Sequence, residues 1–125
     1  MEAKRPARTP QPPYYSVVFT SVREEGDHGY SEMAKEMAEL VRSQPGFLGS
    51  DECRGADGLG ITVAYFDTEE NVKAWRANAS HTVARNLGRE RWYKSYALHV
   101  AKVERAYSWE RPEDSEQSEE SEQPE

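Results

Sequence analysis

Residues 47–66 read FLGSDECRGADGLGITVAYF, and this stretch decides the fold. Asp57-Gly58 in its middle favours the positive-φ backbone of a tight hairpin turn. From Leu59 to Phe66, apolar residues alternate with small or polar ones, which is typical of a strand with one buried face. The stretch therefore predicts an antiparallel hairpin, with strands over residues 47–54 and 59–66.

The residues before the hairpin predict a strand and then a helix. The run YYSVVFTSV at residues 14–22 is rich in β-branched and aromatic side chains, which favour strands. Beyond a polar loop the spacing of the apolar residues changes to that of a helix, and Pro45-Gly46 ends the pattern. The residues on this helical stripe are Tyr30, Met33, Met37, Leu40 and Val41.

The residues after the hairpin predict a second helix and a last strand. Asp67 or Thr68 can cap the helix, and the acidic residues behind them suit its dipole. We expect the segment 78–80 to interrupt the helix, with Ser80 capping a second piece over residues 81–87. A short turn at 89–93 then leads to a strand from about Tyr96 to Tyr107.

The resulting order is β-α-β-β-α-β, which predicts an α+β, ferredoxin-like fold. Such a chain forms a four-stranded antiparallel sheet with both helices on one face. No residues remain to cover the other face, whose apolar side chains need burial against a second subunit. We therefore expect a homodimer.

Charge divides the 125 residues into three parts. Residues 1–13 hold three bases, one acid and four prolines, and residues 110–125 hold eight acids and one Arg, so both ends are predicted to be disordered. The domain over 14–109 has 12 bases and 14 acids, which argues against a nucleic-acid partner.

Cysteine content and hydropathy set further expectations. A single Cys excludes a disulfide scaffold and a zinc site built from cysteines, and it favours a reducing cytoplasm. No apolar run approaches the roughly 20 residues that cross a bilayer, so no membrane association is expected. We also expect no metal site and no nucleotide cofactor, because none of the motifs that bind them occurs.

Four stretches together resemble the antibiotic biosynthesis monooxygenase (ABM) superfamily. They are YYSVVFTSV, SQPGFLGSDECRGADGLGITVAYFDTEE, AWRANASHTVARNLGRERWY and YALHVAKVERAY, which span residues 14–107 of the predicted domain. The resemblance implies a dimeric α/β barrel in which the sheets of two ferredoxin-like protomers pack face to face. It also implies one of several activities, since the superfamily includes cofactor-free monooxygenases of polycyclic phenols, heme-degrading monooxygenases and members with no assigned reaction.

Three residues are candidate catalytic residues. Trp75 lies on the apolar stripe of the second helix and is either a core residue or the wall of a ligand cavity. His81 can serve as a base or an iron ligand. On an unbroken helix it lies about 120° from Trp75, whereas a helix break turns it inward. Asn71 lies one turn before Trp75, and the resemblance implies that such a pair orients a phenolic substrate.

Three further residues are candidate substrate-binding residues: Arg85, Arg89 and Trp92. The arginines can bind a carboxylate or phenolate, or can pair with surface acids. Trp92 can line the ligand cavity together with Trp75, or it can pack at the start of the last strand.

The first interpretation of function is an ABM-type monooxygenase that acts on an electron-rich aromatic or similar small molecule. The second is a heme-binding or heme-degrading dimer with His81 as ligand. Against the second, the first strand lacks the Asn of the heme-degrading pattern, and His81 follows Trp75 by six residues instead of about ten. The third is a non-enzymatic dimer that binds a small molecule.

Overall fold

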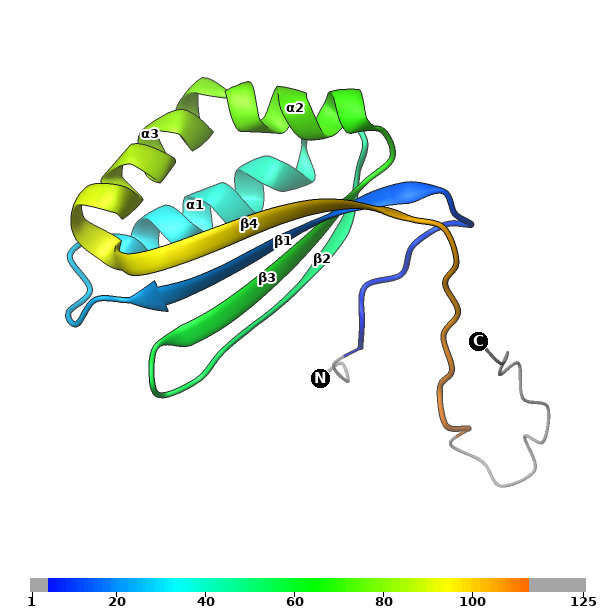
Figure 1. Cartoon of the computed structure of the whole chain (residues 1–125), viewed down its shortest axis with the longest axis horizontal. Helices are drawn as coiled ribbons and strands as arrows, with labels where there is room; N and C mark the ends of the chain where they lie inside the picture. Colours follow the sequence, from blue (N-terminus) through cyan, green and yellow to red (C-terminus); the bar gives the residue numbers. More distant parts are fainter. Residues whose placement is uncertain (1–4, 113–125) are drawn as a thin grey trace.

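The computed structural model describes residues 5–112, and residues 1–4 and 113–125 lie outside the described part. The chain folds as βαββαβ, with the second helical region divided and followed by a π-helical turn, η1 (Figure 1). The elements are β1 (Tyr14–Arg23), α1 (Tyr30–Arg42), β2 (Phe47–Arg54), β3 (Leu59–Phe66), α2 (Glu69–Ala77), α3 (Ala79–Leu87), η1 (Gly88–Trp92) and β4 (Tyr93–Val103).

The sheet has the strand order β2-β3-β1-β4, and every neighbouring pair is antiparallel. The helices α1, α2 and α3 lie on one side of it (Figure 1). This arrangement confirms the predicted ferredoxin-like fold. The bounds of β2 and β3 are those predicted from the Asp57-Gly58 turn, and Gly58 has the positive φ of 93° that the turn requires.

Two predicted element boundaries were wrong. β4 begins at Tyr93 and ends at Val103, whereas the sequence suggested about Tyr96 to Tyr107. It begins early because η1 ends at Trp92 and Tyr93 pairs at once with Arg23, beyond a bulge in the β1–β4 ladder. The cap of α3 was also misplaced, because it is Asn78 and not Ser80.

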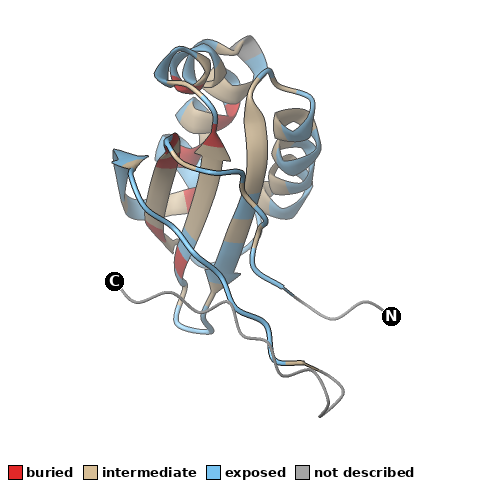
Figure 2. Ribbon diagram, turned by 90° about the vertical axis from the view of Figure 1, so that its right-hand side faces the viewer, coloured by how far each residue is buried: buried red, intermediate tan, exposed pale blue. Residues whose placement is uncertain are grey.

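Most of the core lies between the sheet and the helices, whereas Tyr14, 4% exposed, is buried on the other face of the sheet (Figure 2). Phe66 is fully buried, and Val72 of α2, Ala84 of α3 and Trp92 of η1 are also buried. Phe66 packs edge-on against Phe47 with ring centroids 5.7 Å apart, which ties the end of β3 to the start of β2.

Within residues 5–112, no helix lies over the opposite face of the sheet (Figure 1). Phe19 packs on Tyr93, which also contacts Tyr30 of α1, so Phe19 points to the helix side. Strand alternation then places Val18 and its cross-strand neighbour Val63 on the other side. Ile61 lies on that side too and is 46% exposed. The apolar face on which the homodimer prediction rests is therefore present.

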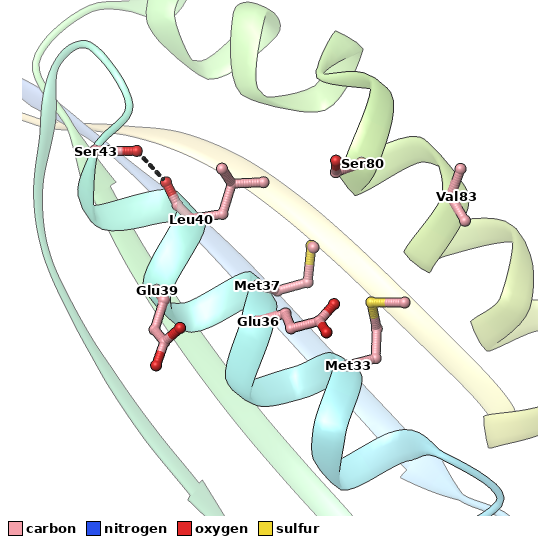
Figure 3. Close-up of a pocket in the computed structure, with 8 residues that line it drawn as sticks. All are labelled: Met33, Glu36, Met37, Glu39, Leu40, Ser43, Ser80 and Val83. Carbon is pink, nitrogen blue, oxygen red and sulfur yellow. Dashed lines mark hydrogen bonds between the residues drawn. The ribbon is translucent and has the colours of Figure 1, made fainter.

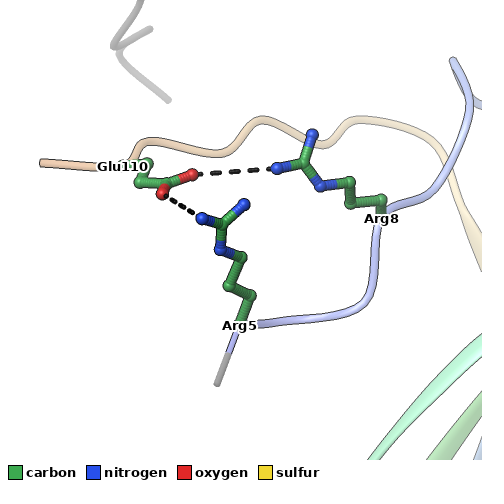
Figure 4. Close-up of polar contacts among 3 residues, drawn as sticks. All are labelled: Arg5, Arg8 and Glu110. Carbon is green, nitrogen blue, oxygen red and sulfur yellow. Dashed lines mark ion pairs between the residues drawn. The ribbon is translucent and has the colours of Figure 1, made fainter. Parts of the chain in front are cut away.

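Residues 5–13 and 104–112 lie on the side of the sheet away from the helices (Figure 1). The backbone N–H of Ala7 donates to Asp51 over 2.8 Å. Glu110 pairs with Arg5 at 3.3 Å and with Arg8 at 3.8 Å (Figure 4). These ion pairs are exposed and contribute little stability. Within the predicted leader, residues 5–13 thus make defined contacts, whereas residues 1–4 and 113–125 lie outside the described part.

Candidate functional site

The break between α2 and α3 shapes the candidate site. Asn78 has φ −59° and ψ 132°, which ends α2, and its side-chain oxygen accepts from the backbone N–H groups of Ser80 (3.0 Å) and His81 (3.2 Å). Those are the second and third residues of α3, the donors that an N-cap satisfies. Asn78 is therefore the cap, and the prediction of Ser80 was wrong by two residues.

The break brings His81 onto Trp75. Their rings are stacked, with centroids 4.2 Å apart and planes 13° from parallel. His81 Nδ1 lies 2.9 Å from the carbonyl oxygen of Trp75. An unbroken helix would place the two side chains about 120° apart. The Trp75–His81 pair therefore depends on the change of helix direction at Asn78.

This contact fixes the tautomer of neutral His81. A carbonyl oxygen only accepts hydrogen bonds, so Nδ1 carries the hydrogen and Nε2 keeps its lone pair. Burial lowers the pKa of His81 below its usual 6.5, the hydrogen bond to Trp75 partly opposes this, and the charges of Arg85 and Arg76 lower it further. His81 is consequently neutral at pH 7 and presents an unprotonated Nε2.

Arg85 is the second candidate that the structure places near His81. Its guanidinium donates to the carbonyl oxygen of Arg76 over 3.2 Å, which links α3 to the last turn of α2. Its positive charge lies close enough to lower the pKa of His81. Trp75, His81 and Arg85 thus form one group at the α2–α3 break.

The Asn71 side chain is directed elsewhere. Its amide nitrogen donates to Asp67 over 2.8 Å. Gly46 lies against this pair, since a Cβ at Gly46 would collide with both side chains. Asn71 therefore belongs to the junction between the Pro45-Gly46 turn and the start of α2.

Arg89 and Trp92 lie in η1, away from the break. Arg89 Nε donates to the Tyr96 hydroxyl over 2.7 Å. Trp92 is 4% exposed, and its indole N–H donates to the carbonyl oxygen of His28 over 2.9 Å. Trp92 accordingly packs where η1 enters β4.

The helix side of β4 has accessible apolar surface. Leu98 and Val100 pair with Phe19 and Val17, so they share the face of the sheet that the helices occupy. Each is nevertheless 45% exposed. Apolar side chains on the helix side are thus open to a ligand.

A separate cavity of about 590 Å³ lies between α1 and α3. Its lining residues are Met33, Glu36, Met37, Glu39, Leu40, Ser43, Ser80 and Val83 (Figure 3). None of the six predicted site residues is among them. The sequence assigned Met33, Met37 and Leu40 to the core stripe and gave no signal that they border a cavity.

Residues 5–112 hold neither a helix that could span a membrane nor a cluster of metal-ligating side chains. No helix in that range is long and apolar enough to cross a membrane. In the same range, no three side chains of His, Cys, Asp or Glu are grouped so as to hold a metal ion.

Removing the Asn78 cap should both destabilise the protein and displace His81. Asn78→Ala leaves two backbone N–H groups of α3 without their acceptor, so we expect a loss of about 1 kcal/mol in the free energy of unfolding. Asn78→Asp retains the acceptor and is the matched control. Chemical denaturation measures the loss, and equal stability of Asn78→Ala and wild type would contradict this role.

Similarity to known proteins agrees with this fold and shows the class of protein. The family model for antibiotic biosynthesis monooxygenases matches residues 13–87, and the chain belongs to this family. It is 50% identical over 99 residues to the uncharacterized protein YqjZ of Bacillus subtilis (strain 168), a match that covers 79% of this chain and 87% of the relative.

Solved structures of low sequence identity share the fold. A putative antibiotic biosynthesis monooxygenase from Nitrosomonas europaea is 14% identical, with a TM-score of 0.62 over 77% of this chain and 94% of that protein. SnoaB of Streptomyces nogalater, a cofactor-independent oxygenase, is 11% identical, with a TM-score of 0.65 over 76% of this chain and 97% of that one.

Proposed function

We propose that this protein is a monooxygenase that oxidises an electron-rich aromatic, or a similarly acidic small molecule, without a bound cofactor. The observation that carries the proposal is the stacking of His81 on Trp75, with His81 Nδ1 2.9 Å from the Trp75 carbonyl oxygen, which leaves Nε2 available as a base. Family membership and the cofactor-independent oxygenase SnoaB, which shares the fold, support the same reaction type.

The chemistry needs a base, a surface for the aromatic body and a counter-charge. His81 Nε2 removes a proton from the substrate and gives a carbanion that reacts directly with oxygen. The Trp75 ring, stacked on His81, offers apolar surface to the rings of the substrate. The Arg85 cation stabilises the negative charge that forms on the substrate oxygen.

Anthrone is a suitable probe, because its CH₂ group is acidic and its oxidation balances simply. The base takes one CH₂ proton, the carbanion adds oxygen, and loss of water gives anthraquinone, so one O₂ is consumed and one water formed per anthrone. An oxygen electrode measures the rate, with the reaction in buffer alone subtracted. Dihydroxynaphthalene serves as a second electron-rich probe in the same assay. If oxygen uptake with the protein equals uptake in buffer alone for both compounds, the proposal is contradicted.

Heme binding is a second candidate function, because an imidazole nitrogen with a free lone pair is also a ligand for heme iron. When bound, heme would supply the activation of oxygen, and His81 would hold its iron. A Soret band that appears on adding hemin and is lost in His81→Ala would support this function. Binding of anthrone without oxygen uptake would instead support a non-enzymatic small-molecule-binding protein.

We further propose that the active form is a homodimer joined through the open face of the sheet, and that it works in a reducing cytoplasm. The apolar residues on that face support the dimer. Cys53, the single cysteine, is exposed on β2 and supports the reducing compartment.

A further inference from the structure

The cavity between α1 and α3, named here the α1–α3 groove, has an apolar floor. Met33, Met37 and Leu40 recur every three or four residues along α1, and their side chains extend toward the side where α3 carries Ser80 and Val83 (Figure 3). The groove therefore runs along two helices on the outside of the sheet layer.

The floor of the α1–α3 groove remains in contact with solvent. Val83 is 53% exposed, and no residue of α1 is fully buried. A ligand that covers these side chains gains about 25 cal/mol for each Å² of apolar surface removed from water. Methionine side chains are flexible and polarizable, which suits them to ligands of varied shape.

The charge of the α1–α3 groove is negative. Among its eight lining residues are two carboxylates, Glu36 and Glu39, and no basic side chain. Both carboxylates are exposed, and in Figure 3 the Glu36 side chain lies next to Met33, whereas the Glu39 side chain points away from α3, so Glu36 supplies the charge at the groove. A cation gains Coulomb energy there, whereas an anion of the same shape is repelled.

We propose that the α1–α3 groove binds a small apolar cation, such as an alkylammonium or arylammonium compound. Its volume of about 590 Å³ lies within the range of small-molecule sites, roughly 300 to 1,000 Å³. Trp75, His81 and Arg85 do not line it, so the proposal stands independently of the proposed oxidation.

Two probes of equal chain length and opposite charge test the proposal: octyltrimethylammonium and octyl sulfate, each below its micelle concentration. Calorimetry gives the Kd, and NMR of methionine methyl groups locates the binding. We expect the cation to bind at least about tenfold more tightly than the anion and to shift the methyl signals of Met33 and Met37. Equal binding of the two probes, or binding of neither, would overturn the proposal.

Two matched variants show whether the charge of Glu36 itself, and not the loss of any negative charge on α1, favours binding of the cation. Glu36→Gln should weaken binding of the cation about five- to tenfold. Glu32→Gln removes the same charge from an exposed position of α1 that does not line the groove, and should leave the Kd unchanged. An unchanged Kd in Glu36→Gln would overturn the proposal. So would self-association of the protein that excludes the cation and is abolished by Val83→Glu, because the groove would then be an interface between two chains.

Discussion

Replacing His81 with glutamine should lower the rate of anthrone oxidation by about 10²- to 10⁴-fold, the usual contribution of a general base. Glutamine approximates the size of the imidazole but has no basic nitrogen at neutral pH. Protein-dependent oxygen uptake by wild type and His81→Gln measures the ratio. Thermal unfolding must accompany it, because a variant that melts much earlier has lost more than the base.

The pH profile gives an independent test of the same role. Burial lowers the pKa of His81, so Nε2 stays unprotonated down to a pH below 6.5. The wild-type rate should fall only as the pH drops through that lowered pKa, because protonation removes the lone pair. The Trp75→Phe variant keeps an aromatic ring beside His81, so its rate should show the same fall at low pH. If the wild-type rate fell with a midpoint above pH 6.5, or if His81→Gln showed the same fall, the assignment of His81 as the base would be contradicted.

The fold was accessible from sequence because its strongest signals are local. The Asp57-Gly58 turn fixes the register of β2 and β3, and alternation along Leu59–Phe66 fixes which face each side chain takes. The start of β4 was misplaced because it depends on a long-range pairing. Tyr93 becomes a strand residue by pairing with Arg23, which lies seventy positions earlier in the chain.

The candidate site was accessible only in part. Residue type and family resemblance selected Trp75 and His81, but their stacking depends on one residue, Asn78, whose backbone leaves the helical region. Ser80 is also a good cap in principle, so local preference alone does not choose between them. Asn71 was selected by its spacing from Trp75, but its amide bonds to Asp67 on the other side, one turn earlier in the chain. Trp92 was selected by residue type, and its hydrogen bond to His28 joins it to a distant part of the chain that the sequence does not reveal.

Placing a charge on the open face of the sheet should convert the proposed homodimer to monomers. In a twofold dimer each interface residue occurs twice, so Ile61→Glu introduces two carboxylates. Burying an unpaired charge costs several kcal/mol, and each 1.4 kcal/mol is tenfold in Kd. We therefore expect the dimer Kd to rise at least about 100-fold. Light scattering at micromolar concentration would then give the mass of one chain, 14.3 kDa, for the variant and about twice that for wild type.

Val83→Glu is the matched control for this substitution. Val83 is 53% exposed and Ile61 46%, so both changes replace an accessible branched apolar residue with the same carboxylate. They differ in place, because Val83 lies on α3, on the helix side of the sheet, whereas Ile61 lies on the open face. Val83→Glu should remain a dimer. A wild-type mass of about 14 kDa, or dimers in both variants, would mean that something other than a second sheet covers Val18, Ile61 and Val63. The segment that includes Ala7 would then be the first to examine, since it already bonds to Asp51 at the edge of that face.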